Sequence, residues 1–189
     1  LPSQFMENWC RYAPTLKSFA RHIETDEPIP DALVDKIAAA RTHRAAYHTQ
    51  RQVHFAIMDL EMHGMTRHPI DIFRLEQQVA RRTMVKQPLA EDRYLATFTH
   101  MFAGGYAAAY YSYKWAETMS ADAFSAFLEA VQKAENDDEA NAIRQRVGLR
   151  FRDTILSLGG AVHPADVFRS FRGHDPDGRA LLRSSGLLT

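Results

Sequence analysis

The amino-acid sequence predicts an all-α fold, and three observations lead to this prediction. Apolar residues recur with helical spacing over long segments, helix start and stop signals divide the chain repeatedly, and strand signals are nearly absent. A length of 189 residues suffices for one compact domain with a real core. We therefore expect a helical bundle of roughly seven to nine helices, which forms a single all-α domain over residues 1–189.

Prolines determine the first elements. Pro2 suits the first turn of a helix that runs to about Cys10, and Pro14 forces a break near Tyr12 before the helical pattern restarts. The sequence TDEPIP at residues 25–30 is rich in turn-forming residues and predicts a loop.

A long helix is expected from Asp31 to about His63, where Gly64 ends it. It carries two apolar stripes. The first contains Leu33, Ile37, Ala40, Val53, Ile57 and Leu60, and the second contains Phe55, Met58 and Met62. Two stripes indicate that the helix is covered on more than one side.

The middle of the chain continues the helical pattern. Pro69 can open a helix that reaches about Arg82, whereas residues 88–93 have weak signals. Residues 107–117 and 121–134 have the composition of strong helix formers.

Capping signals organise the C-terminal part. Asn136 followed by Glu139 is typical of a helix start, and that helix is expected to end near Gly159. Two further starts are predicted at N-cap and proline pairs, His163-Pro164 and Asp175-Pro176.

Composition narrows the function classes. Basic and acidic residues number 23 each, and no basic block occurs, so we expect no nucleic-acid partner. No apolar run is long enough for a transmembrane helix, so we expect no membrane partner. The single cysteine, Cys10, excludes an internal disulfide framework and fits a reducing compartment. The N-terminus has no signal-peptide pattern, and a chain that starts on Leu1 inside a helical pattern looks like a piece of a longer protein.

The segment GGYAAAYYSYKW at residues 104–115 concentrates aromatic residues behind two glycines. If it is helical, Tyr106, Tyr110 and Tyr113 share one face, and Tyr111 and Trp115 lie close to the opposite side. A row of neutral phenols can donate hydrogen bonds to a carbonyl oxygen or an oxyanion. The alternative is packing in a bundle with the hydroxyls at the rim, which the spacing alone favours modestly.

His100 precedes this segment. It can join the tyrosines if residues 103–105 form a loop, and the glycines there allow positive φ or close approach to a ligand.

Metal and nucleophile motifs are missing from the sequence. None of the nine histidines lies four residues from another, so the H-E-x-x-H pair that binds zinc is absent, and we predict no metal site in this chain. Asp59 and His63 are four apart, and we interpret them as a solvated face. Cys10 has no obvious base, and no G-x-S-x-G or phosphate-binding glycine motif occurs.

Several long stretches resemble one family in order along the chain. They are LPSQFMENWC (1–10), HIETDEPIPDALVDKIAAAR (22–41), RQVHFAIMDLEMH (51–63), HMFAGGYAAAYYSYKWAETMSADAFSAF (100–127), RFRDTILSLGG (150–160) and FRSFRGHDPDGRALLRSSGL (168–187). The family is that of the thimet oligopeptidase and oligopeptidase A zinc metallopeptidases, and the match is closest to the oligopeptidase A group. It covers essentially the whole chain.

The resemblance implies the C-terminal part of the catalytic lobe of a two-lobed, all-α, zincin-type peptidase that cuts short peptides. The family's zinc is held by an HExxH helix and a further Glu, and that Glu immediately precedes the segment matching Leu1. The implied zinc therefore belongs to the full-length enzyme, and none is expected on this chain, which alone would be inactive.

The resemblance also implies roles for residues of the aromatic segment. His100, Tyr106 and Tyr113 match catalytic residues that contact substrate and stabilise the tetrahedral intermediate. Tyr110 matches a substrate-side tyrosine, and Gly104 and Gly105 match a flexible loop that closes over the peptide. Tyr111 and Trp115 are left as the packing face.

Ala109 and Lys114 depart from the usual glycine and leucine of the relatives, and Arg11 and Tyr12 depart from an aromatic-acidic pair. None of these departures touches the histidine and tyrosine set, so they put fine specificity in doubt rather than the mechanism.

Two function classes stay open. The first is the C-terminal part of a zinc endopeptidase with short peptide substrates. The second is a non-catalytic binding or assembly subunit that kept the fold, and a separately encoded half that reassembles is a third possibility.

The expected partner is the missing N-terminal portion or a homodimer mate, which would cover an exposed apolar patch of more than a few hundred Å². The expected location is the cytoplasm, with the mitochondrial or another organelle matrix as the alternative.

Overall fold

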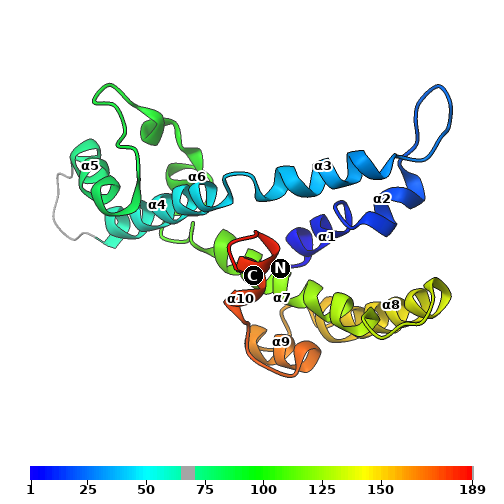
Figure 1. The fold of residues 1–189 in the computed structure, drawn as a ribbon. Coiled ribbons are helices and arrows are strands. Elements are labelled where there is room, and N and C mark those ends of the chain that lie inside the picture. Colours follow the sequence, from blue (N-terminus) through cyan, green and yellow to red (C-terminus); the bar gives the residue numbers. More distant parts are fainter. Residues whose placement is uncertain (65–70, 189) are drawn as a thin grey trace. The chain divides into compact units, whose positions relative to one another are not determined.

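The structure, a computed structural model that describes residues 1–64 and 71–188, is built from helices (Figure 1). Within those residues it contains ten α-helices, one short 3-10 helix and one π-helical turn, and no strand. An isolated bridge joins Arg21 to Pro28. The all-α prediction is confirmed, although the helices outnumber our expectation.

The chain forms two compact units, Leu1–His43 with Ala116–Thr189 and Arg44–Trp115. The first unit contains α1 (Pro2–Trp9), α2 (Ala13–Phe19), α3 (Asp31–Thr42), most of α7 (Ser112–Val131), α8 (Asp137–Phe151), the π-helical turn η2 (Arg152–Leu156), α9 (Pro164–Arg172) and α10 (Gly178–Ser184). The second contains α4 (Ala45–Gly64), α5 (Ile72–Thr83), the 3-10 helix η1 (Tyr94–Thr97), α6 (Thr99–Phe102) and the start of α7.

The core of the first unit is aromatic. Phe5 of α1 stacks on Phe151 of α8 with ring centroids 4.1 Å apart, and Phe151 meets Phe171 of α9 edge-on at 5.3 Å. All three rings are buried. Burial of each such side chain contributes about 1.5–3 kcal/mol, so this contact holds three helices together.

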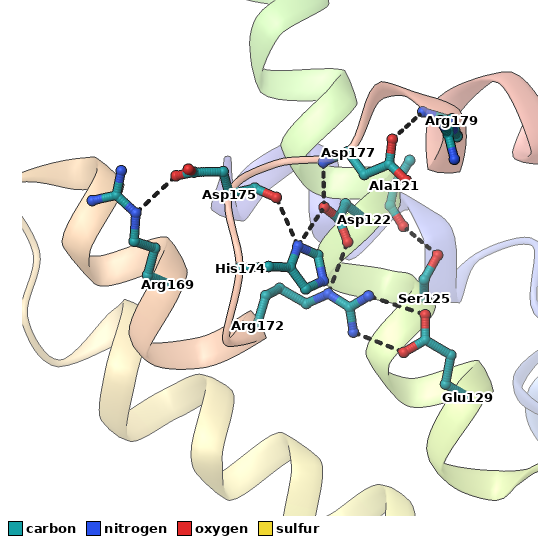
Figure 2. A network of polar contacts seen from close by, with 10 residues as sticks. All are labelled: Ala121, Asp122, Ser125, Glu129, Arg169, Arg172, His174, Asp175, Asp177 and Arg179. Carbon is teal, nitrogen blue, oxygen red and sulfur yellow. Dashed lines mark hydrogen bonds and ion pairs between the residues drawn. The ribbon is translucent and has the colours of Figure 1, made fainter.

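A polar network connects α7 with the end of α9 and the start of α10 (Figure 2). Asp122 of α7 is 1% exposed and accepts hydrogen bonds from Arg172 Nε at 2.8 Å and from the main-chain N–H of Asp177 at 2.7 Å. These bonds tie the end of α9 and the start of α10 to α7. We call Asp122, Glu129, Arg172, His174 and Asp177 the Asp122 network.

The core of the second unit lies where α4 packs against α5. The predicted stripe of Phe55, Met58 and Met62 is buried there. It meets Leu75 and Val79 of α5, and the cluster is completed by Leu95, Phe98, Met101 and Tyr110. The core therefore supports the segment that carries the aromatic residues.

The other apolar stripe of the predicted long helix is mostly exposed. Leu33, Ile37, Val53 and Leu60 keep large exposed fractions, so the prediction that both sides of the helix are covered is wrong within this chain. On α3, Val34 is the buried residue.

Several predicted helix starts are confirmed. Pro2 opens α1, the Asn136 side chain accepts from the N–H of Glu139 at the start of α8, and His163 caps α9 ahead of Pro164. The predicted start at Asp175-Pro176 is wrong. α10 begins at Gly178, because Asp177 is the residue whose side chain accepts from the helix N–H of Arg179.

The predicted helix from Asp31 to His63 is in fact two helices. α3 ends at Thr42 and α4 begins at Ala45, and Arg44 between them has a left-handed backbone with φ of 53°. Thr42 donates its hydroxyl to the carbonyl of Ala39, a local bond that competes with helix continuation. No glycine or proline marks this break in the sequence.

Asp71 accepts hydrogen bonds from the N–H groups of Phe73 and Arg74 and caps α5, which therefore begins at Ile72. The predicted start at Pro69 lies outside the described residues. The predicted end near Arg82 agrees with the observed last residue, Thr83.

Candidate functional site

The aromatic segment begins as a loop rather than a helix. Residues 103–111, which we call the tyrosine loop, form turns, and α7 starts only at Ser112. The prediction of helix from residue 107 is wrong, and Ala108 has a left-handed backbone with φ of 56°. The helical face on which the three tyrosines were expected to lie therefore does not exist as such.

Glycine is required at positions 104 and 105 for different structural reasons. Gly105 has φ of 76°, a region that favours glycine. At Gly104 an added Cβ would lie 3.0 Å from His100 Cα and 3.2 Å from the Thr99 carbonyl oxygen, which are backbone atoms. The turn after α6 therefore packs against the backbone that carries His100.

The loop nevertheless brings the four predicted aromatic residues together. The His100 ring lies 5.8, 6.0 and 5.8 Å from the rings of Tyr106, Tyr110 and Tyr113, measured between centroids. Tyr113 lies 5.1 Å from Tyr106 and 5.3 Å from Tyr110. We call these four residues the His–Tyr cluster.

Members of the cluster differ in their access to solvent. Tyr106 is 37% exposed, and His100 and Tyr113 are half-buried. Tyr110 is 9% exposed, and its hydroxyl donates to Gln52 Oε1 at 2.7 Å. The imidazole and two phenols are therefore on the accessible side, and Tyr110 supports them from within the core.

The phenols of Tyr113 and Tyr110 are both held in the neutral form. A hydrogen bond with the Tyr106 side chain, together with burial and the neighbouring phenols, raises the pKa of Tyr113 to about 12. Burial is the main cause that raises the pKa of Tyr110, followed by Tyr94, whereas Arg51 opposes it. At neutral pH these groups keep their protons and can act as hydrogen-bond donors.

The two residues of the predicted packing face are exposed. Tyr111 is 49% and Trp115 is 56% exposed, so the assignment of these two side chains to the core is wrong within this chain. Tyr110 takes the core position instead because the segment is a loop at that point.

Sequence reasoning missed the residue that holds the loop. Asp59 of α4 is 0% exposed, and its Oδ1 and Oδ2 accept the main-chain N–H groups of Ala108 at 3.0 Å and Tyr110 at 2.9 Å. Its interpretation as a solvated face with His63 is wrong. The available signal was its position beside Met58 and four residues after Phe55, within an apolar stripe where a carboxylate needs partners.

A separate cavity of about 200 Å³ lies in the same unit and contains no member of the His–Tyr cluster. Arg51, Glu76 and Asp92 are among its lining residues. Burial is the main cause that raises the pKa of Glu76, and Asp92 adds to it, while Arg93 opposes it. We assign no ligand to this cavity.

Within residues 1–64 and 71–188, no group of three or more His, Cys, Asp or Glu side chains is arranged to hold a metal ion. In the same residues, no helix combines the length and the apolar character needed to cross a membrane.

Comparison with known proteins matches residues 1–187 to Peptidase family M3. The whole chain is 51% identical to the organellar oligopeptidase A of Arabidopsis thaliana, described as chloroplastic/mitochondrial, and covers 23% of that protein. It is 50% identical to a probable cytosolic oligopeptidase A of the same plant and 39% identical to oligopeptidase A of Escherichia coli (strain K12), covering 26% of each. The chain thus spans about a quarter of the length of these relatives. The predicted resemblance is confirmed, and the chain belongs to Peptidase family M3.

Proposed function

We propose that this chain is part of an oligopeptidase that hydrolyses short peptides. The proposal is supported by the family and by relatives named oligopeptidase A. Because the chain spans about a quarter of those relatives, the activity is proposed for the longer protein that contains this sequence.

The convergence of His100, Tyr106 and Tyr113 is the observation that carries the proposed role of this chain. Hydrolysis of a peptide bond places negative charge on the former carbonyl oxygen in the tetrahedral intermediate. Preorganised neutral donors stabilise that charge more than they stabilise the substrate. We propose that Tyr113 and His100 donate to this oxygen, and that the single hydroxyl proton of Tyr113 turns from Tyr106, its partner in the free protein, to the oxyanion when that forms.

The remaining predicted residues have supporting roles in this proposal. Tyr110 is proposed to support the substrate side from below, through its ring contacts with His100 and Tyr113, since its hydroxyl is bonded to Gln52. Gly104 and Gly105 are proposed to let the tyrosine loop close over the peptide, which fits the positive φ of Gly105.

The zinc that the family resemblance implies does not fit the residues of this chain. The described residues offer no group that could hold a metal, so we propose that other parts of the full-length enzyme hold it. The contribution proposed for this chain is limited to binding, orientation and hydrogen-bond donation.

Tyrosine-to-phenylalanine variants of the full-length enzyme test the proposal. Tyr113→Phe is expected to lower kcat by about 10²–10³, the usual effect of losing one oxyanion donor. Tyr106→Phe is expected to lower it less. The matched control is Tyr111→Phe, because Tyr111 is exposed and lies in the same loop but outside the cluster. Near-normal kcat in both cluster variants would refute the proposed roles.

The proposed macromolecular partner is the rest of the peptidase. Leu33 and Ile37 of α3 and Val53 and Leu60 of α4 are exposed here and need cover in a soluble enzyme. A second copy of this chain is the alternative, and ultracentrifugation of the separate chain distinguishes the two, because only the alternative predicts a stable dimer.

A cytoplasmic location is proposed, with an organelle matrix as the alternative, since the relatives include a probable cytosolic and an organellar enzyme. Cell fractionation with detection of the full-length protein tests this proposal, and recovery with a purified organelle would favour the alternative.

A further inference from the structure

The tyrosine loop is anchored by a single buried carboxylate. Both oxygens of Asp59 are used, because Oδ1 accepts the N–H of Ala108 and Oδ2 accepts the N–H of Tyr110. Asp59 lies on α4, 49 and 51 residues before these partners. The anchor therefore joins the loop to a regular helix of the same unit rather than to its own neighbours in sequence.

The proton on His63 can be assigned from its partners. Its Nδ1 lies 2.9 Å from Asp59 Oδ1 and 2.9 Å from the main-chain oxygen of Asp59. Both of these oxygens are acceptors, so Nδ1 carries the hydrogen. His63 therefore supplies a third donor to the residue that holds the loop, and it fixes the orientation of the carboxylate.

The anchor acts at the strained point of the loop. Ala108 has φ of 56°, a left-handed conformation that is unfavourable for a non-glycine residue. The N–H of this same residue is bonded to Asp59. A hydrogen bond to a carboxylate is stronger than one between neutral groups, so this bond offsets the backbone strain.

The anchored residues lie between Tyr106 and Tyr113 in the sequence. Ala108 follows Tyr106 by two positions, and Tyr110 contacts Tyr113 with ring centroids 5.3 Å apart. We infer that Asp59 is a positioning residue that fixes the tyrosine loop for catalysis, with His63 holding its carboxylate. This inference rests on the proposed function of the His–Tyr cluster.

The variant Asp59→Asn tests the inference in the full-length enzyme. The side chain keeps its shape, but the amide has one acceptor oxygen, so one of the two loop N–H groups loses its partner. A displacement of the donors by about 1 Å is expected to lower kcat by up to 10²-fold, with a smaller change in KM. Asp153→Asn is the control, because Asp153 is an exposed aspartate in the first unit.

Hydrogen–deuterium exchange gives a readout that does not depend on activity. In Asp59→Asn, deuterium uptake of a peptide covering residues 103–111 is expected to rise, while uptake of α5 stays unchanged. If Asp59→Asn unfolds the protein, His63→Gln provides the second variant, since it keeps the carboxylate and weakens only its orientation. A smaller rise in deuterium uptake, confined to residues 103–111, is then expected.

The two readouts separate the inference from the proposed function. Unchanged loop uptake in both variants overturns the inference. Asp59→Asn could raise deuterium uptake of the loop and still leave kcat normal while Tyr113→Phe lowers kcat. That result would overturn the inference that Asp59 positions the loop for catalysis. If Tyr113→Phe and Tyr106→Phe keep normal kcat, the proposed function fails, and loop uptake alone decides whether Asp59 holds the loop. If Asp59→Asn and Tyr106→Phe together lower kcat by less than the product of their separate factors, Asp59 acts through Tyr106.

Discussion

Asp59 and Asp122 are buried carboxylates with the same task in different units. They are almost inaccessible, at 0% and 1% exposure, and they accept main-chain N–H groups from segments far along the chain, two at Asp59 and one at Asp122. The partners of Asp59 lie 49 and 51 residues away, and the partner of Asp122 lies 55 residues away. A buried carboxylate thus replaces the local signals that would otherwise fix these segments.

The two carboxylates differ in the group that balances their charge. Asp122 is paired with the guanidinium of Arg172, whose other nitrogens bond Glu129 at 2.9 and 3.0 Å (Figure 2). Burial alone would lower the pKa of Arg172, but its bonds with Glu129 and Asp122 raise it above the ordinary value. Asp59 is paired with the imidazole of His63, which is charged only when it is protonated.

The charge partner of each carboxylate matches the kind of segment that the carboxylate holds. Asp122 fixes the regular helix α10 with a permanently charged partner, which suits a part of the fold that has no reason to move. Asp59 fixes an irregular loop with a partner that is charged only when protonated, which suits the closure over a substrate that we propose for this loop. The comparison predicts that the Asp122 network governs stability and that Asp59 governs the site.

The largest expected effect on stability comes from Asp122→Ala. It leaves Arg172, whose side chain is 10% exposed, with Glu129 as its acidic partner, and breaking a buried ion pair costs about 3–5 kcal/mol. We expect the lower end of this range because Glu129 remains. Urea denaturation measures the free energy of unfolding, and Asp153→Ala, which removes an exposed carboxylate, is expected to change it little. If Asp122→Ala lowered the free energy of unfolding less than Asp59→Ala does, the comparison would be reversed.

A pair of glycines tests the comparison next. Gly105 in the tyrosine loop and Gly173 at the end of α9 have φ of 76° and 82°, so alanine at either position costs about 1–2 kcal/mol. Gly173→Ala is expected to show this cost in unfolding with kcat unchanged. Gly105→Ala is expected to lose less stability, because the exposed loop can shift, and to lower kcat. Gly178→Ala is the control, since an added Cβ there meets no atom within 4 Å. Equal effects of the first two variants on kcat would contradict the comparison.

Tyr110→Phe is expected to have a smaller effect. The change removes the hydroxyl that donates to Gln52, a bond with a net contribution of about 0.5–1.5 kcal/mol. The ring and its contacts in the cluster stay, so kcat should fall much less than in Tyr113→Phe. A loss of kcat as large as that of Tyr113→Phe would indicate that the Tyr110 hydroxyl leaves Gln52 to contact substrate.

Local patterns predicted the parts of the fold that local interactions decide. The caps at Asn136 and His163 and the buried stripe around Phe55 and Met58 follow from side chains close in sequence. The all-α class follows from the same signals. The break at Arg44 was not predictable in this way, since a non-glycine residue in the left-handed region leaves no mark in the sequence.

The tyrosine loop shows why the rest was missed. Its alanines favour helix, but Asp59 takes the N–H groups of Ala108 and Tyr110 that a helix would need for its own bonds. That contact is long-range, so no local propensity contains it. The membership of the His–Tyr cluster was predicted even though the helical reason given for it was wrong, and the roles of its residues came from family resemblance.

The smallest expected effect concerns His54, whose pKa is lowered by burial and, secondarily, by the charge of Arg51. Since the unfolded chain binds a proton at this group near pH 6.5, the stabilising contribution of neutral His54 is present above that pH. It is lost as the pH falls through the lower pKa of the folded state. His54→Gln should therefore flatten the decline of the urea midpoint as the pH falls below about 6.5. The same series for His48→Gln, an exposed residue of α4, should keep the decline. If the slope for His54→Gln equalled that of the parent protein, other groups would have to account for acid sensitivity in the unit that contains Asp59.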